Sequence, residues 1–165
     1  MKRIFKRAFV AAICMIALIA ASCEQEKYDP NLTVAPGGGT VTTFKAYTLG
    51  STTADNVYGR IVFYKYSASV TLVQMGLYNT SASSTYTAKI FSGTAIAGST
   101  TTLENLDGVD GATGAFATYK YFTINKPGFF DQLSSYNANV KVMLNATTVA
   151  SGDIGGNADP VSESE

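Results

Sequence analysis

Between residues 40 and 157 the chain alternates short apolar stretches with clusters of glycine, asparagine, aspartate and serine. Many of the stretches are rich in β-branched and aromatic residues, and none shows a helical apolar period of useful length, which is typical of β-strands. The predicted strands cover residues 40–48, 57–66, 69–78, 85–91, 100–106, 115–124, 139–145 and 148–154. In the third of these, both sets of alternating positions are fairly apolar, which predicts a central strand.

Two connections have patterns of their own. The second and third strand-like stretches lie so close together that they predict a tight hairpin. Residues 127–135 predict a single helical turn on a connection, with Phe129, Phe130 and Leu133 filling the core. About eight short strands at this spacing predict an all-β fold, a single antiparallel β-sandwich or barrel over residues 40–157.

The first 22 residues have the three parts of an export signal. Basic residues precede an apolar stretch over residues 8–20, and Ala-Ala-Ser stands directly before Cys23. This junction resembles the lipobox of bacterial lipoproteins, which implies cleavage before Cys23 and attachment of diacylglycerol and an acyl chain such as palmitate. As a helix the apolar stretch would span about 20 Å, less than the roughly 30 Å hydrocarbon core, so a spanning helix is the less favoured alternative.

The segments that flank the predicted domain are polar. Residues 23–39 predict a flexible tether with an acidic start and a Gly-Gly-Gly stretch. The acidic start resembles the surface-export signal of Bacteroidetes lipoproteins, and a plain soluble linker is the alternative. Residues 158–165 predict a disordered acidic tail. With Cys23, these features predict an outer-membrane lipoprotein on the periplasmic face or the cell surface, with covalent lipid and no other cofactor.

Charge and cysteine content narrow the range of partners. Four of the 12 basic residues lie in the predicted signal, so the mature chain would carry 8 basic and 12 acidic residues. A net charge of about −4 argues against nucleic acid as a partner. With Cys14 lost in the signal and Cys23 lipidated, the mature domain would hold no disulfide. A domain of about 120 residues can bury a core without one.

Three stretches, in this order, resemble the chordin-type (CHRD) domain as it occurs in bacterial lipoproteins. They are Val-Tyr-Gly-Arg-Ile-Val-Phe at 57–63, Leu-Asp-Gly-Val-Asp-Gly-Ala-Thr-Gly at 106–114 and Ala-Ser-Gly-Asp-Ile-Gly-Gly-Asn at 150–157. The third stretch is the most specific of them. The resemblance covers residues 40–157 and implies a small β-sandwich that acts by binding or as a scaffold.

The chain departs from this family at its histidines. Family members carry an Ala-His-Ile-His segment where this chain has Lys89 and Phe91, and a later histidine where it has Met143. The chain contains no histidine at all. Because lysine and phenylalanine cannot replace imidazole as a copper or zinc ligand, no metal role is carried over from the family. We interpret Lys89, Phe91 and Met143 as the converted, non-metal remnant of a family site.

Other candidate chemistry is sparse. Without histidine, a serine nucleophile would need a lysine or carboxylate base, and no spacing for such a pair stands out, so we expect no enzyme activity. Asn105, Asp107 and Asp110 lie among glycines and offer oxygen ligands to Ca²⁺. The same residue types suit a turn between two strands, which is the interpretation we favour.

Arg60 and Asp153 lie in the first and last of the three family-like stretches. We expect the first and last strands to be neighbours, with Arg60 and Asp153 forming an ion pair, and two solvated side chains are the alternative. Nine of the ten tyrosines also lie in the predicted domain. On a shared exposed face they would suit sugar rings or a protein partner, but rings half-buried on the sheet are the favoured interpretation.

These features together predict a non-catalytic binding or scaffold module at the cell envelope, with a protein or polysaccharide partner that the sequence does not name. A carbohydrate-binding or adhesin-type surface module is the first alternative, and it would show an exposed row of aromatic side chains. An enzyme is the second alternative, and it would need a concave pocket holding a perturbed lysine or carboxylate.

Overall fold

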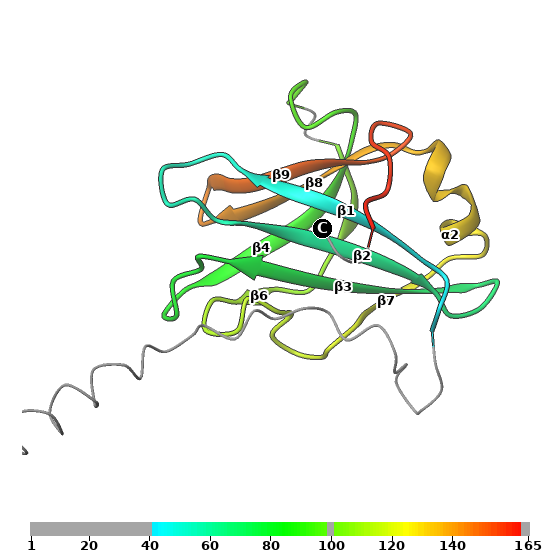
Figure 1. Cartoon of the computed structure of the whole chain (residues 1–165), viewed down its shortest axis with the longest axis horizontal. Coiled ribbons are helices and arrows are strands. Elements are labelled where there is room, and N and C mark those ends of the chain that lie inside the picture. The colour runs from blue at the N-terminus through cyan, green and yellow to red at the C-terminus, as the bar shows by residue number, and fades with distance from the viewer. Residues whose placement is uncertain (1–40, 99–100, 163–165) are drawn as a thin grey trace, which may run out of the picture.

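The computed structural model describes residues 41–98 and 101–162, which form an antiparallel sheet with one short helical segment (Figure 1). The strands are β1 (Phe44–Ser51), β2 (Tyr58–Lys65), β3 (Val70–Tyr78), β4 (Thr85–Ser92), β5 (Thr102–Asn105), β6 (Val109–Asp110), β7 (Phe122–Asn125), β8 (Asn137–Leu144) and β9 (Thr147–Gly155). The helical segment consists of α2 (Phe129–Gln132) and the 3₁₀ turn η1 (Leu133–Ser135). The predicted all-β fold is confirmed.

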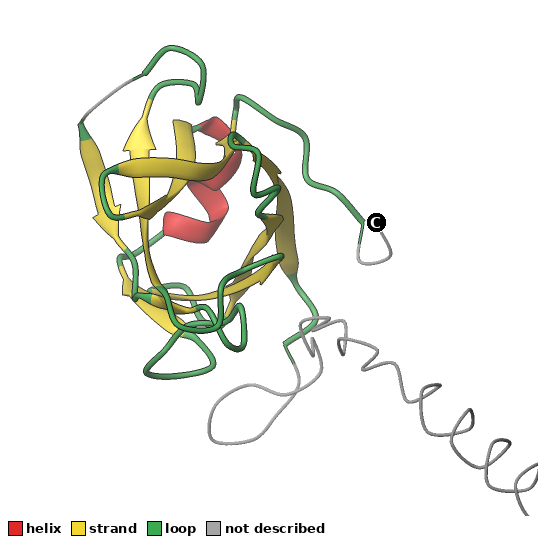
Figure 2. Cartoon of the chain, turned by 90° about the vertical axis from the view of Figure 1, so that its left-hand side faces the viewer, coloured by secondary structure: helices red, strands yellow, loops and turns green. Residues whose placement is uncertain are grey.

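The strands follow the order β5-β4-β8-β9-β1-β2-β3-β7, and β6 pairs with β4. Every pair is antiparallel. The sheet curls into an open barrel around the helical segment, as the end-on view in Figure 2 shows, and its two terminal strands are β5 and β7. β1 and β9 pair through Gly50 and Ser151, so the first and last strands are neighbours in the middle of the sheet.

The inner face of the barrel carries the main hydrophobic core. Ile61, Phe63, Val73 and Met75 of β2 and β3 are completely buried there. Burying such a side chain contributes roughly 1.5–3 kcal/mol. A second cluster on the outer face consists of Val41, Ala46, Val62, Tyr64 and Leu72. Because β3 contributes to both clusters, it is buried on both faces, as predicted for residues 69–78.

The helical segment closes one end of the barrel. Gly128 precedes it with a φ of 70°, which glycine adopts without strain, and donates its N–H to Ala68 O (2.9 Å). Phe129, Phe130 and Leu133 are buried in the main core. The predicted helical turn and its place in the core are therefore confirmed.

Two lysines attach α2 to the strands. Lys45 Nζ donates to Phe130 O (3.0 Å) and lies 4.7 Å from the centroid of the Phe130 ring. Lys65 Nζ pairs with Asp131 Oδ1 at 2.6 Å, with both side chains partly exposed. The first contact is partly buried, and the second faces solvent, where an ion pair contributes little to stability. The burial of Phe129, Phe130 and Leu133 therefore attaches α2 more strongly than the two lysines do.

The structure differs from the strand predicted over residues 115–124. β7 covers only its last part, and residues 117–120 form an exposed loop. The loop follows a bridge between Val109 of β6 and Phe116 and leads into β7, which pairs with β3. Between these two points its side chains have no neighbouring strand to pack on. β6 was not predicted because two residues carry no periodic pattern.

The chain after β9 returns to β1. Val161 donates its N–H to Ala46 O (2.8 Å) and packs on the second cluster, and Ala158 packs against the main core, so these two residues of the predicted tail contact the barrel. The predicted signal peptide, Cys23 and the tether lie outside the described residues. Within those that are described, no helix is long and apolar enough to cross a membrane.

Candidate functional site

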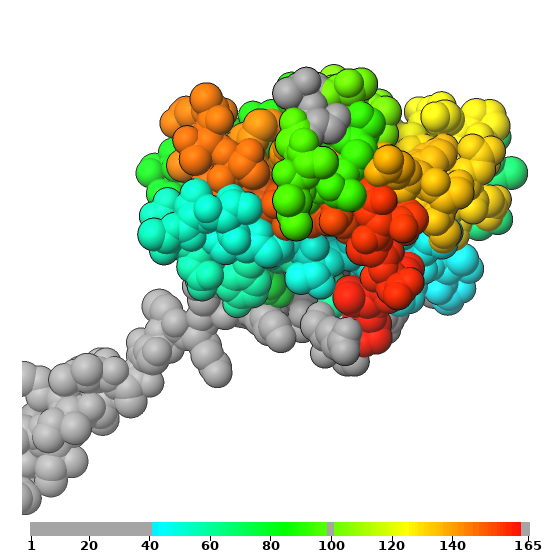
Figure 3. Space-filling model, turned by 90° about the horizontal axis from the view of Figure 1, so that it is seen from above, coloured from blue at the N-terminus to red at the C-terminus, as the bar shows by residue number. Residues whose placement is uncertain are grey.

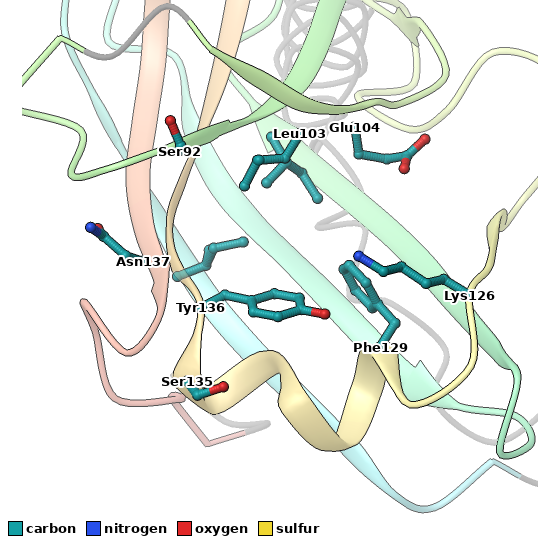
Figure 4. Close-up of a pocket in the computed structure, with 10 residues that line it drawn as sticks. Ser92, Leu103, Glu104, Lys126, Phe129, Ser135, Tyr136 and Asn137 are labelled. Atoms are coloured by element: carbon teal, nitrogen blue, oxygen red, sulfur yellow. The ribbon is translucent and has the colours of Figure 1, made fainter.

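The terminal strands β5 and β7 leave a seam along the barrel. At one end, the loop after β6 reaches β3, where Leu77 donates its N–H to Gly114 O (2.8 Å). At the other end, beside α2 and η1, the seam holds a pocket of about 310 Å³, the seam pocket (Figure 4). Its lining residues are Ile90, Ser92, Leu103, Glu104, Lys126, Phe129, Ser135, Tyr136, Asn137 and Ile154.

The floor of the seam pocket is apolar and aromatic. Ile90 of β4 and Ile154 of β9 belong to the inner face of the sheet, and Phe129 enters from α2. The rings of Phe129 and Tyr136 meet edge to face, with centroids 5.4 Å apart and an interplanar angle of 66°. Phe129 also packs against Phe63, with centroids 6.2 Å apart. The aromatic wall of the pocket is therefore held by the core.

Two charged side chains of opposite sign flank the pocket. Lys126 extends across it from the end of β7, with Nζ 6.0 Å from the Phe129 centroid and 5.6 Å from the Tyr136 centroid (Figure 4). Glu104 stands on the opposite side, on β5. Neither side chain forms an ion pair within residues 41–98 and 101–162. Both can therefore interact with a ligand at the mouth of the pocket.

Local irregularities give the pocket its shape. The register between β4 and β5 shifts after Ile90, and this bulge leaves Leu103 without an opposed residue in β4. Leu103 is 50% exposed and forms one edge of the pocket. On the other side, Pro127 cannot donate to a neighbouring strand, so β7 ends before it and Lys126 stands at the strand end.

Lys89, Phe91 and Met143 lie on the outer face of β4 and β8, away from the seam pocket. The pairing of β4 with β8 places Lys89 opposite Lys141, with Phe91 and Met143 in the neighbouring rows of the same outer face. Lys141 Nζ lies 5.3 Å from the centroid of the Phe91 ring. The three residues thus lie in successive rows of one face, with Lys89 between Met143 and Phe91, and their role as a converted family site stays a prediction.

Asp107 and Asp110 accept hydrogen bonds from nearby backbone groups. Asp107 accepts from the N–H groups of Gly108 (2.8 Å) and Thr118 (3.0 Å), and Asp110 Oδ1 accepts from that of Ala112 (2.8 Å). The Asp110 contact is an Asx turn, and Asp107 ties the loop at Thr118 to the turn after β5. Over the two described ranges, no three or more histidine, cysteine or acidic side chains are grouped so as to hold a metal ion.

Arg60 and Asp153 lie on two strands that are separated by β1. Arg60 stands opposite Thr48, and Gly152 approaches Thr48 from the other side. Asp153 Oδ1 accepts the N–H of Ala95 at 2.6 Å. Asp153 therefore holds the loop that follows β4, and its ion pair with Arg60 stays a prediction.

The stretch at 150–157 has a structural role at the same loop. Asn157 Nδ2 donates to Gly93 O (3.2 Å) and to Ala138 O (3.1 Å), and Asn139 Nδ2 donates to Gly93 O (2.9 Å). Figure 3 shows this loop, in green, between β8 and β9, in orange, and the C-terminal segment, in red. Asp153 and Asn157 of this stretch thus hold the loop that follows β4 in place through Ala95 and Gly93.

The exposed tyrosines of the described chain do not share one row. Tyr58 and Tyr66 flank opposite ends of β2, and Tyr119 lies in the loop before β7. Tyr47 is buried in the core, and burial, with a smaller contribution from the Asp159 carboxylate, raises the pKa of its hydroxyl. Of the nine tyrosines in the domain, Tyr78, Tyr121 and Tyr136 are half-buried as predicted, and the others are either buried or exposed. The rings of Tyr58 and Tyr78 pack together with centroids 5.1 Å apart.

No family model, curated protein or solved structure matches the chain. The resemblance to the CHRD domain therefore stays a prediction. Sequence reasoning missed Glu104 and Lys126 and named Tyr136 only as one of the nine tyrosines of the domain. The three residues line one pocket only because the sheet curls and α2 closes its end. The available signal was the Lys-Pro-Gly-Phe-Phe sequence at 126–130, which places a cation beside two buried rings.

Proposed function

We propose that this chain is an outer-membrane lipoprotein whose β domain is a non-catalytic binding module, with the seam pocket as its ligand site. Lipid on Cys23 would hold the domain at the membrane, because two or more acyl chains give stable anchoring. Support for the anchor comes from the basic, apolar and small-residue segments that precede Cys23.

The observation that carries the binding role is the composition of the seam pocket. Ligand pockets in proteins are mostly apolar, with a few polar groups that orient the ligand, and have volumes of about 300–1,000 Å³. The seam pocket, at about 310 Å³, has an apolar floor with Lys126 and Glu104 at its sides. It suits a compact apolar group that carries a charge at one end.

A sugar-binding surface has less support. Sugar rings stack on aromatic side chains that share an exposed face, but Tyr58 and Tyr66 lie at opposite ends of β2. The two rings in the seam pocket, Phe129 and Tyr136, meet at a steep angle and do not make a flat platform. The pocket is therefore the better candidate site.

The binding role is tested with 4-fluorophenylacetate, which combines an aromatic ring with a carboxylate. We expect its ¹⁹F NMR signal to broaden on addition of the intact lipoprotein in detergent. In the control variant Leu103→Trp, a large ring at the half-exposed edge fills the pocket, and the broadening should be lost. Equal broadening by the two proteins, or none by either, contradicts the proposed site.

The membrane anchor is tested in cells. Labelled palmitate should be incorporated into the wild type and not into Cys23→Ala. External protease should then cut the anchored protein if it is displayed on the surface and leave it intact if it faces the periplasm. Incorporation of labelled palmitate into Cys23→Ala at the level of the wild type would contradict the assignment of Cys23 as the lipidated residue.

A further inference from the structure

The free edge of β5 borders the seam pocket. Ala88 O accepts the N–H of Leu106 (3.1 Å), and Asn105 stands opposite Lys89 in the next pair. In an antiparallel pair of strands, opposed residues whose backbone groups hydrogen-bond each other alternate with opposed residues whose backbone groups point away from the partner strand. Leu106 and Ala88 form a pair of the first kind, so Asn105 belongs to the second kind, and its backbone N–H and C=O point away from β4. In the described part of the chain, β5 ends the sheet on this side. Such an edge is a template for another strand.

The pocket lies where side chains of an added strand would point. Glu104 stands opposite Ile90, which faces the core, so a residue placed opposite Glu104 in an added strand would also face inward. The next inward side chain, two residues along, would lie beside Leu103 and over the floor of the pocket. A volume of about 310 Å³ is ample for one leucine or phenylalanine side chain.

The two sides of the pocket carry unlike charges. Glu104 stands on β5, and Lys126 is held over the pocket by its contacts with the rings of Phe129 and Tyr136. Neither charge is paired within the described ranges. An extended segment with one basic and one acidic side chain on the face of its apolar residue would complement both charges.

We propose that the seam pocket binds an extended peptide, which adds to β5 as an extra strand and places one apolar side chain in the pocket, with charges complementary to Glu104 and Lys126. This inference rests on the proposed binding role of the pocket and names its ligand class. In strand addition, main-chain hydrogen bonds supply affinity, and pockets for alternate side chains supply specificity. The edge of β5 supplies the first and the seam pocket supplies the second.

The specificity is tested with two fluorescein-labelled peptides, read by fluorescence anisotropy with the intact lipoprotein in detergent. Their sequences, Lys-Thr-Leu-Thr-Glu and Glu-Thr-Leu-Thr-Lys, place both charges on the face of the leucine because side chains alternate along a strand. The strand direction decides which charge meets Lys126, so one peptide should bind about tenfold more tightly than the other.

A charge swap gives the matched control. In the double variant Glu104→Lys with Lys126→Glu, the preference between the two peptides should reverse, since the same two positions then carry the opposite charges. Both positions are at the surface, and the pocket floor is unchanged. If the preference is absent in the wild type, or persists unchanged in the swapped protein, the charges do not recognise the peptide and the proposal is wrong.

Strand pairing is tested separately with Asn105→Pro. This change removes an N–H that points away from β4, and proline is tolerated on a free edge. Peptide affinity should fall about threefold to tenfold through the loss of one hydrogen bond, while binding of 4-fluorophenylacetate should stay as in the wild type. From the peptide side, N-methylation of the leucine or of the preceding threonine should weaken binding at one of these two positions, because their N–H groups point to opposite sides.

The outcomes separate this inference from the proposed function. If 4-fluorophenylacetate binds and neither peptide does, the pocket takes small molecules only, and the peptide proposal is wrong while the binding role stands. If the peptides bind but neither Asn105→Pro nor N-methylation has an effect, strand addition is wrong. If none of the three probes binds, both proposals fail.

Discussion

The seam between β5 and β7 is closed in different ways at its two ends. At the β6 end, backbone meets backbone: Leu77 donates to Gly114 O, and a Cβ on Gly114 would lie 2.1 Å from Leu77 O. At the α2 end, Phe129 and Leu133 fill the space between the strands with side chains. The seam pocket of about 310 Å³ lies at this second end.

This difference shows how an open barrel can keep both stability and a binding site. A main-chain contact brings two segments within hydrogen-bonding distance and leaves no room between them. At the α2 end, side chains bridge a wider gap, and the space that they leave is the seam pocket with its apolar floor. We therefore expect changes at the α2 end to separate into those that affect folding and those that affect binding.

The largest effect is expected at the α2 end, on replacing Leu133, which is completely buried. Leu133→Ala should lower the free energy of unfolding by about 2–5 kcal/mol, through lost burial and the cavity that remains. Urea denaturation followed by far-UV circular dichroism measures this change.

Leu103→Ala is the matched control for Leu133→Ala. Leu103 is half-exposed at the edge of the same pocket, so its loss should cost less than about 1 kcal/mol and mainly weaken binding of the ligand probes. Similar losses of stability in the two variants would show that Leu103, at the pocket edge, contributes to folding as much as Leu133, in the helical segment.

A smaller effect is expected at the β6 end, for Gly114→Ala. Gly114 has a φ of 68°, and the new Cβ would press on the carbonyl group of Leu77. The positive φ alone costs about 1–3 kcal/mol for a residue with a side chain, and the contact with Leu77 adds to that cost. The unfolding free energy should fall accordingly.

Gly98→Ala provides the comparison for Gly114→Ala. Gly98 has a φ of 69°, but among the described residues no heavy atom other than those of Gly98 and its chain neighbours lies within 4 Å of the position of its Cβ. Both variants therefore share the conformational cost, and only Gly114→Ala adds the close contact. If Gly98→Ala is as destabilising as Gly114→Ala, the backbone contact at Leu77 does not limit the closure of the seam.

Sequence patterns predicted the sheet better than they predicted the seam. Alternating apolar positions and the turn residues between them predicted six strands to within two residues at each end, because each of these strands buries one face or two in a regular way. The first strand was predicted over residues 40–48 and lies further along, at Phe44–Ser51. Residues 115–124 have a less regular alternation and form a loop in their first half. In the folded sheet this segment leads from β6, which pairs with β4, to β7, which pairs with β3, and β3 and β4 are not neighbours.

The seam pocket is less visible in the sequence because its residues are far apart in the chain. Glu104 and Lys126 look like ordinary charged surface residues in the sequence, and they become candidates for ligand binding only because they line opposite sides of one pocket. Lys89, Phe91 and Met143 were selected by a family resemblance and lie on the outer face instead. Sequence alone indicates which residues are unusual for a family, but facing edges appear only in the folded barrel.

The smallest effect concerns the interior of the α2 end and depends on pH. Tyr47 packs against Phe63, with ring centroids 6.1 Å apart, and Phe63 packs in turn against Phe129. Burial raises the pKa of Tyr47 in the folded protein, while an unfolded tyrosine ionises near pH 10. Above about pH 10 the folded state therefore binds more protons than the unfolded state, and stability falls as pH rises through the raised pKa.

Tyr47→Phe removes this one contribution and keeps the ring. We expect the free energy of unfolding to fall more steeply for the wild type than for Tyr47→Phe above about pH 10, with the difference between them constant below that pH. Urea denaturation of both proteins at a series of pH values from neutral to alkaline measures the two slopes. Parallel slopes above pH 10 would show that the Tyr47 hydroxyl ionises as readily in the folded barrel as in the unfolded chain, and hence that the aromatic interior at the α2 end admits water.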